Sequence, residues 1–134
     1  MSNVLHLHIV SPASSVLDTH VEMVEIPGLE GDFGVLPHHA PFFSMLRPGV
    51  ITAYLPEKRL KRLFATSGYA EVSPEGCTVI SDDIHDLESI TPEEAKEVLE
   101  RAERDVNHAH TDLDKAKATK RMEAAKALVE AITA

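Results

Sequence analysis

The chain has 134 residues, one cysteine, no tryptophan and a formal net charge of −9, and a chain of this length forms one domain or one domain with an appendage. The acidic balance argues against nucleic acid or an anionic lipid surface as the main partner, and a single cysteine excludes an internal disulfide framework. No window approaches the roughly 20 apolar residues of a membrane span, and we expect no signal or transit segment, so membrane association would have to go through a partner.

The first ninety residues alternate between short apolar runs and turn residues. Residues 4–10 place Leu5, Leu7 and Ile9 on one face with His6 and His8 on the other, which is the two-residue period of a half-buried strand. Further strands are predicted over residues 21–26, 50–55, 60–66, 69–72 and 77–82. This series of short strands, with a turn signal about every 8 to 12 residues, predicts an antiparallel β-sandwich or barrel.

Residues 26–50 are dominated by turn-forming residues, because they hold four of the six glycines and four of the eight prolines. Such a segment cannot be a helix, and we interpret it as very short strands separated by tight turns, with Asp32, His38 and His39 at the turns. Its apolar side chains are expected to need a core to pack in: Val35, Leu36, Phe42, Phe43, Met45 and Leu46. A stiff ribbon of this kind suits a surface that docks on another molecule.

The pattern changes to helical near residue 91. Thr91 can cap a helix, Pro92 fits its first position and Glu94 completes a capping box. We expect this helix to break near residues 107–111 and a second helix to follow, forming an antiparallel hairpin. The apolar faces of both helices are rich in alanine and bury little area, which favours a movable arm (residues 88–134) on a rigid β domain (residues 1–87).

No motif for nucleotide binding, nucleophilic catalysis or zinc coordination is present, so no catalytic residue, cofactor or metal site is predicted. Histidines occur in pairs, as at His6 and His8, but the sequence shows no third or fourth ligand converging on an ion, and scattered surface histidines are the favoured interpretation. The acidic run over residues 82–88 lacks calcium-loop spacing and is expected to be a solvated linker. Cys77 lies in a predicted strand and is expected to be a buried small apolar residue.

Two segments resemble a known family. The run IPGLEGDFGVLPHHAPFFSMLRPGV (residues 26–50) resembles the signature of the epsilon subunit of F-type ATP synthases, and ATSGYAEVSPEGCTVISDD (residues 65–83) resembles the second conserved block of that family. The resemblance implies a sandwich of ten short antiparallel strands followed by a two-helix hairpin. It also implies a non-catalytic rotor subunit that joins the gamma subunit to the membrane c-ring, couples proton flow to ATP synthesis and lies on the cytoplasmic side of the bacterial inner membrane. The equivalent mitochondrial subunit is called delta.

The resemblance carries expectations for single residues. Glu30 and Asp32 would face the c-ring, and His39 and Phe42 would contact gamma. In several relatives the hairpin reaches the alpha/beta head and inhibits ATP hydrolysis, which is left open here. The candidate contacts to beta are Lys115, Lys120 and Arg121.

The sequence also departs from the family pattern. Many relatives have glycine where this chain has His38, and a Gly-Gly pair is replaced by Ser67-Gly68. Thr91 and Glu94 stand where the ATP-binding relatives have an acid and an arginine, so we expect no tight regulatory ATP site. The alternative is a β-sandwich module that binds a small ligand and oligomerises through its hairpin, and an enzyme acting alone is disfavoured.

Overall fold

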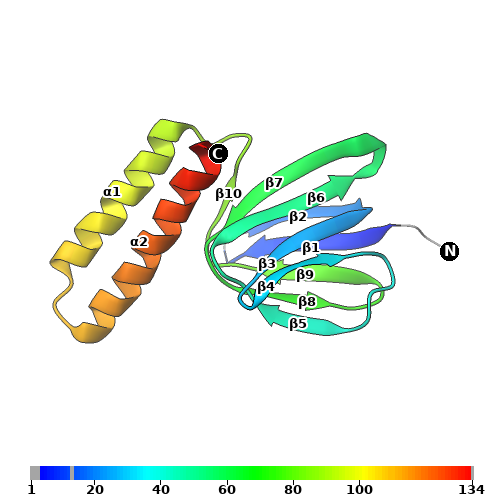
Figure 1. Cartoon of the computed structure of the whole chain (residues 1–134), viewed down its shortest axis with the longest axis horizontal. Helices are drawn as coiled ribbons and strands as arrows, with labels where there is room; N and C mark the ends of the chain where they lie inside the picture. The colour runs from blue at the N-terminus through cyan, green and yellow to red at the C-terminus, as the bar shows by residue number, and fades with distance from the viewer. Residues whose placement is uncertain (1–3, 13, 134) are drawn as a thin grey trace. The chain divides into compact units, whose positions relative to one another are not determined.

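The computed structural model describes residues 4–12 and 14–133 and divides into two compact units, Met1–Glu88 and Ser89–Ala134. The first unit is a β-sandwich and the second is a helical hairpin (Figure 1). The sandwich consists of β1 (Leu5–Ser11), β2 (Ser14–Val21), β3 (Met23–Gly28), β4 (Gly31–Val35), β5 (Phe42–Met45), β6 (Gly49–Leu55), β7 (Arg59–Ala65), β8 (Tyr69–Val72), β9 (Gly76–Ile80) and β10 (Ile84–Asp86).

These strands form two five-stranded sheets, as Figure 1 shows. Sheet 1 has the order β2-β1-β9-β8-β5, and sheet 2 has the order β10-β7-β6-β3-β4. The predicted ten-stranded sandwich with a helical hairpin is therefore confirmed. One pair departs from the antiparallel expectation, because β1 and β9 run parallel, with His6 opposite Gly76 and Val10 opposite Ile80.

The core lies between the two sheets and follows the alternation of the strands. In β1 the side chains of Leu5, Leu7 and Ile9 are fully buried, whereas His6 on the opposite face is exposed. Cys77 is 1% exposed, which confirms that it packs as a small apolar residue. The remaining buried apolar side chains of this core are Val21, Val24, Ile26, Val35, Leu46, Ile51, Ala53, Leu63, Ala65, Ala70, Val72 and Val79.

Two turn positions have left-handed backbone. Gly68 has φ = 113°, and a Cβ atom there would lie 1.8 Å from the carbonyl oxygen of Ile80, so only glycine fits. His38 has φ = 67°, a conformation that favours glycine. The turn that many relatives would build with glycine is therefore retained at His38 with a less suitable residue.

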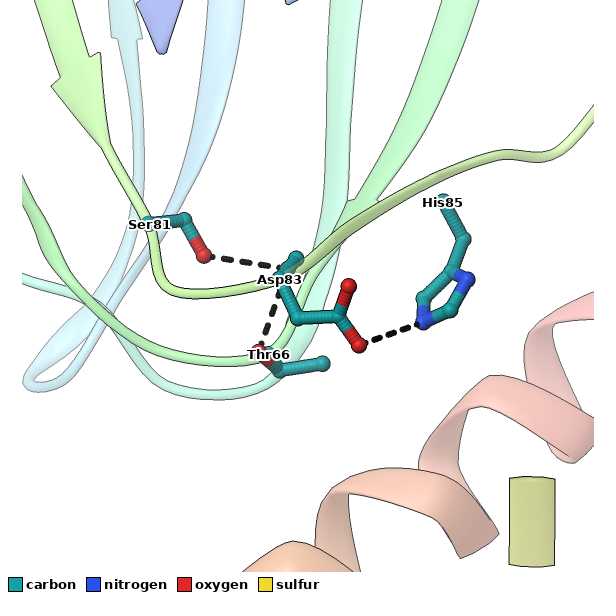
Figure 2. Close-up of polar contacts among 4 residues, drawn as sticks. All are labelled: Thr66, Ser81, Asp83 and His85. Carbon is teal, nitrogen blue, oxygen red and sulfur yellow. Dashed lines mark hydrogen bonds and ion pairs between the residues drawn. The ribbon is translucent and has the colours of Figure 1, made fainter. Parts of the chain in front are cut away.

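The turn between β9 and β10 is tied to the end of β7 by one carbonyl group (Figure 2). The carbonyl oxygen of Asp83 accepts hydrogen bonds of 3.1 Å from the backbone N–H and the Oγ1 hydroxyl of Thr66, and another of 3.1 Å from the Oγ of Ser81. Ser81 is 1% exposed, so this bond satisfies a buried hydroxyl. The side chain of Asp83 accepts from Nε2 of His85 at 3.0 Å.

The expectation of a solvated linker over this acidic run is wrong for its central part, because Ile84–Asp86 is strand β10. Asp86 accepts a hydrogen bond of 2.6 Å from Nζ of Lys61 on β7 and another of 2.9 Å from the backbone N–H of Glu88. The bond to Asp86 raises the pKa of Lys61. The carboxylates in this run anchor the last strand instead of hydrating a linker.

The helical unit contains α1 (Pro92–His108) and α2 (Asp112–Thr133), which pack against each other. The predicted capping box is present, since Thr91 accepts from the backbone N–H of Glu94 and Glu94 accepts from that of Thr91. The buried residues of α1 are Ala95 and Ala102, as the alanine-rich pattern predicted. No helix within residues 4–12 and 14–133 is long and apolar enough to cross a membrane.

Candidate docking surface

Five large apolar side chains are exposed along the Pro/Gly-rich segment, and we call them the docking patch. Their exposed fractions range from 46% to 62%: Leu29, Leu36, Phe42, Phe43 and Met45. The expectation that the apolar residues of this segment pack in the core is right for Val35 and Leu46 and wrong for the other four it named. The reason is topological, because β5 is the last strand of sheet 1 and has a neighbour on one side only.

Contacts between neighbouring elements make the docking patch continuous. The backbone N–H of Leu29 donates to the carbonyl oxygen of Met45 at 2.8 Å, which joins the β3–β4 turn to the end of β5. Phe33 on β4 meets Phe42 on β5 edge to face, with ring centroids 5.1 Å apart. Phe43 packs beside Tyr69 of β8 at 5.2 Å between ring centroids. The docking patch therefore spans the adjoining edges of both sheets.

His39 lies in the turn before β5, close to the docking patch. Its backbone N–H donates to the carbonyl oxygen of Leu36 at 3.2 Å, and its Nδ1 donates to the carbonyl oxygen of Ala40 at 2.7 Å. Its ring centroid lies 6.4 Å from that of Phe42. The structure thus brings together His39 and Phe42, the two residues predicted to contact gamma.

Glu30 and Asp32 lie on the acidic hairpin tip between β3 and β4. Glu30 is exposed in the turn, while Asp32 Oδ1 is 2.5 Å from Nη2 of Arg47. Arg47 also donates from Nη1 to the carbonyl oxygen of Gly28 at 2.7 Å. Asp32 is therefore already paired within the chain, and Glu30 is the more accessible carboxylate of the two.

Arg47 was not predicted as a site residue, although it connects the hairpin tip to the segment after β5. Its backbone N–H donates to the carbonyl oxygen of Pro27 at 3.0 Å, in addition to the two side-chain contacts. A single arginine in an otherwise uncharged stretch of the ribbon, between Met45 and Pro48, was the available signal. Only the fold shows that this arginine faces residues 28–32.

The docking patch is suited to binding another protein. Monomeric proteins rarely expose a large contiguous apolar area, and such areas mark interaction surfaces. Aromatic side chains and methionine, which are enriched at interfaces, form most of it. The residues that surround it provide hydrogen bonds and ion pairs within the chain, and they include no nucleophile hydrogen-bonded to a base of the kind that covalent catalysis requires.

The basic residues of α2 are exposed but do not all share one face. Lys120 and Arg121 follow Lys117 at helical spacings of three and four residues, so these three side chains lie on one side of the helix. Lys115 is five residues before Lys120, which turns it about 140° away. Lys117 and Arg121 line a shallow depression of about 390 Å³ with Asp105 and Asp114 as its acidic members. The structure therefore brings Lys120 and Arg121 together but not Lys115.

The chain was compared with known proteins. Residues 4–86 match the family model described as "ATP synthase, Delta/Epsilon chain, beta-sandwich domain". The ATP synthase epsilon chain of Rhodospirillum rubrum is 39% identical over 134 residues, covering 100% of this chain and 97% of that relative. The ATP synthase epsilon chain of Maricaulis maris is 37% identical over 129 residues, covering 96% of this chain and 91% of that relative.

Solved structures match the fold at lower identity. A chain of the Euglena gracilis mitochondrial ATP synthase (OSCP/F1/c-ring) superposes with a TM-score of 0.78 at 19% identity, covering 98% of this chain and 83% of that chain. A chain of the Tetrahymena thermophila mitochondrial ATP synthase central stalk and c-ring gives a TM-score of 0.64 at 11% identity, with 96% of each chain covered. At these identities the likeness concerns the arrangement of sandwich and hairpin.

Proposed function

The chain belongs to the ATP synthase delta/epsilon family, and on this premise we propose that its docking patch joins it to the other subunits of the central stalk. It is a non-catalytic stalk subunit of the ATP synthase complex. Family membership over the whole chain favours this function over a free-standing ligand-binding module that oligomerises through its hairpin. The observation that carries the proposal is the continuous apolar surface formed by the family's signature segment.

The gamma subunit is the partner that we propose for the docking patch. Phe42 and Phe43 are 46% and 56% exposed, so burying them against a partner removes a large apolar area from water. His39 lies beside Phe42 with its Nδ1 engaged in its own loop, so the turn presents a fixed shape. A preformed apolar surface loses little entropy on docking, which suits a joint that transmits torque.

The acidic hairpin tip is the part that we propose to face the polar loops of the c-ring. Glu30 is exposed at the tip, and Arg47 holds the backbone of Gly28 and the carboxylate of Asp32 behind it. Through these two contacts the subunit would link gamma to the c-ring and couple proton flow to ATP synthesis. Its position would be peripheral, on the cytoplasmic side of the bacterial inner membrane, by way of the complex.

The hairpin supplies the third contact that we propose, to the alpha/beta head. Lys115, Lys120 and Arg121 are exposed and available to acidic groups of beta. Glu94, at the position where ATP-binding relatives carry arginine, accepts hydrogen bonds from the backbone N–H and hydroxyl of Thr91. Its negative charge supports the expectation that no tight regulatory ATP site is present.

The test compares two sets of exposed apolar residues. The double variant Phe42→Ser/Phe43→Ser should copurify with gamma at least about tenfold less than the parent chain, because truncating central interface residues costs ~2 kcal/mol or more. Leu60→Ser is the matched control, since Leu60 is 51% exposed on β7, outside the docking patch. Circular dichroism checks that both variants are folded. Undiminished copurification of the double variant, or an equal loss in the control, would refute the proposal.

A further inference from the structure

The outer face of β1 and β2 gathers three histidines and an aspartate that are far apart in the sequence. His6 and His8 project from β1 on the side opposite to the buried Leu5, Leu7 and Ile9. In the antiparallel register His6 lies opposite His20, and His8 lies opposite Asp18. Residues paired across two strands point to the same face, so these four side chains form one group, which we call the histidine block.

The imidazole rings of the histidine block are neighbours in space. The ring centroids of His6 and His20 are 5.2 Å apart, and those of His6 and His8 are 6.3 Å apart with nearly parallel planes. Two nitrogen atoms bound to one zinc ion lie roughly 3.3 Å apart, because each Zn–N bond is about 2.0–2.1 Å long. Rings at these separations are within reach of a shared ion after small side-chain rotations.

Asp18 fixes the protonation of one of these rings. Nε2 of His6 donates a hydrogen bond to the carboxylate of Asp18, and this bond lowers the pKa of Asp18. A neutral imidazole that donates from Nε2 has its lone pair on Nδ1. A carboxylate behind an imidazole is the usual arrangement that orients a metal-bound histidine.

The other side of His6 and His8 is open and acidic. Both residues line a shallow depression of about 320 Å³, which also contains Glu71, Glu75 and Gly76. Gly76 pairs with His6 in the parallel register and has no side chain, so the space beside the His6 ring is not filled from β9. The carboxylates of Glu71 and Glu75 make this depression favourable for a cation.

We propose that the histidine block binds a divalent transition-metal ion of the zinc type, with His6, His8 and His20 as ligands and Asp18 as the group that orients His6. Three imidazoles from two adjacent strands are a donor set that zinc accepts, with water in the fourth position. Within the described residues no three donors yet surround a common point, so binding requires rotation of the ligands. His6 and His20 are exposed, and such side chains change rotamer readily.

The proposal does not depend on the docking function, because it concerns the opposite end of sheet 1 from β5. Bound metal would connect the edge strand β2 to β1 through side chains as well as through backbone hydrogen bonds. The sequence pattern identified His6 and His8 only. His20 becomes a third ligand through the β1–β2 register, which no spacing rule in the sequence specifies.

The experiment is a calorimetric titration of the untagged full chain with zinc chloride. We expect one ion per chain, with affinity falling on acidification because protons compete for the ligand nitrogens. His6→Ala, His8→Ala and His20→Ala should each weaken binding at least about tenfold, and Asp18→Asn should weaken it by about tenfold or more as an orienting group. Magnesium, which prefers oxygen ligands, should not bind at this site.

The double variant His108→Ala/His110→Ala is the matched control, because it removes another pair of histidines with the same spacing, at the α1–α2 turn. This control should bind zinc as the parent chain does. Zinc at about 100 times its dissociation constant should also shift the unfolding equilibrium about 100-fold toward the folded state, in the parent chain and the control but not in His20→Ala. Absence of binding, unchanged binding in His20→Ala, or an equal loss in the control would overturn the proposal.

Discussion

Nη2 of Arg47 lies 2.5 Å from Oδ1 of Asp32, and Nη1 of the same guanidinium donates to the carbonyl oxygen of Gly28 at 2.7 Å. One side chain therefore holds both the charge and the backbone of the acidic hairpin tip. The two contacts differ in their surroundings. The ion pair is solvent-exposed, with 42% and 65% of the two side chains accessible, whereas the bond to Gly28 is partly buried.

This difference predicts unequal effects on stability. Asp32→Asn should change the free energy of unfolding by no more than about 0.5 kcal/mol, as expected for an exposed ion pair. Arg47→Ala should cost about 1–2 kcal/mol, because the Gly28 carbonyl loses a charged donor. Urea unfolding of both variants and of the double variant measures these terms. Equal losses in the two single variants would show that the ion pair, and not the Gly28 bond, dominates.

Gly68 and Gly31 provide a second comparison. Both have positive φ, but a Cβ atom at Gly68 would lie 1.8 Å from the carbonyl oxygen of Ile80, whereas one at Gly31 would meet nothing within 4 Å. Gly31→Ala should therefore cost only backbone strain, about 1–2 kcal/mol. Gly68→Ala should cost more than this, because β8 and β9 must move apart. Thermal unfolding of the two variants ranks them, and a Gly68→Ala variant as stable as Gly31→Ala would contradict the predicted clash.

The basic face of α2 predicts which charges matter if the hairpin inhibits ATP hydrolysis. Lys120→Glu/Arg121→Glu reverses two charges on one side of the helix and should raise hydrolysis by the reconstituted complex severalfold. Lys115→Glu reverses one charge on a different side and should have a smaller effect. Hydrolysis assays at equal subunit incorporation give the comparison. Unchanged rates in both variants would indicate a passive hairpin.

Cys77 predicts a change of stability in alkali. Burial raises the pKa of its thiol to about 12 from an ordinary value of 9.0, so folding favours the neutral thiol. The contribution is full below pH 9 and is lost as the pH rises from 9 toward 12. The native chain should react with Ellman's reagent only after unfolding. The alkaline loss should be smaller in Cys77→Ala than in the parent chain, and fast labelling of the native protein would contradict the burial.

Much of the fold follows from local sequence patterns, and the failures have physical causes. The alternation of Leu5, Leu7 and Ile9 and the Thr91 capping box were sufficient to predict β1 and the start of α1. Strand β2 was not recognised as separate, because on an edge strand the burial contrast between its two faces is weak and apolar residues do not alternate strictly. Strand β10 is three residues long and acidic, and it is held by long-range hydrogen bonds that no local pattern encodes.

The candidate site was predicted in position but not in character. The Pro/Gly content located the segment, yet the sequence could not tell which of its apolar residues face outward. Val35 and Leu46 are buried and Phe42 and Phe43 are exposed because of their places in the two sheets, not because of their hydrophobicity. Arg47 and His20 acquire their roles through partners that lie distant in the chain, at Asp32 and His6.

The parallel pairing of β1 with β9 also determines when the sandwich can be completed during synthesis. β1 emerges first from the ribosome, but its second neighbour is residues 76–80, opposite residues 6–10. Until those residues emerge, one edge of β1 lacks its backbone partner, and the inner face of sheet 1 lacks Cys77 and Val79. The nascent chain therefore carries an incomplete sheet for most of its translation, and closure of the sandwich is a late, long-range step. The hairpin, whose contacts are local, can form as soon as α2 is made.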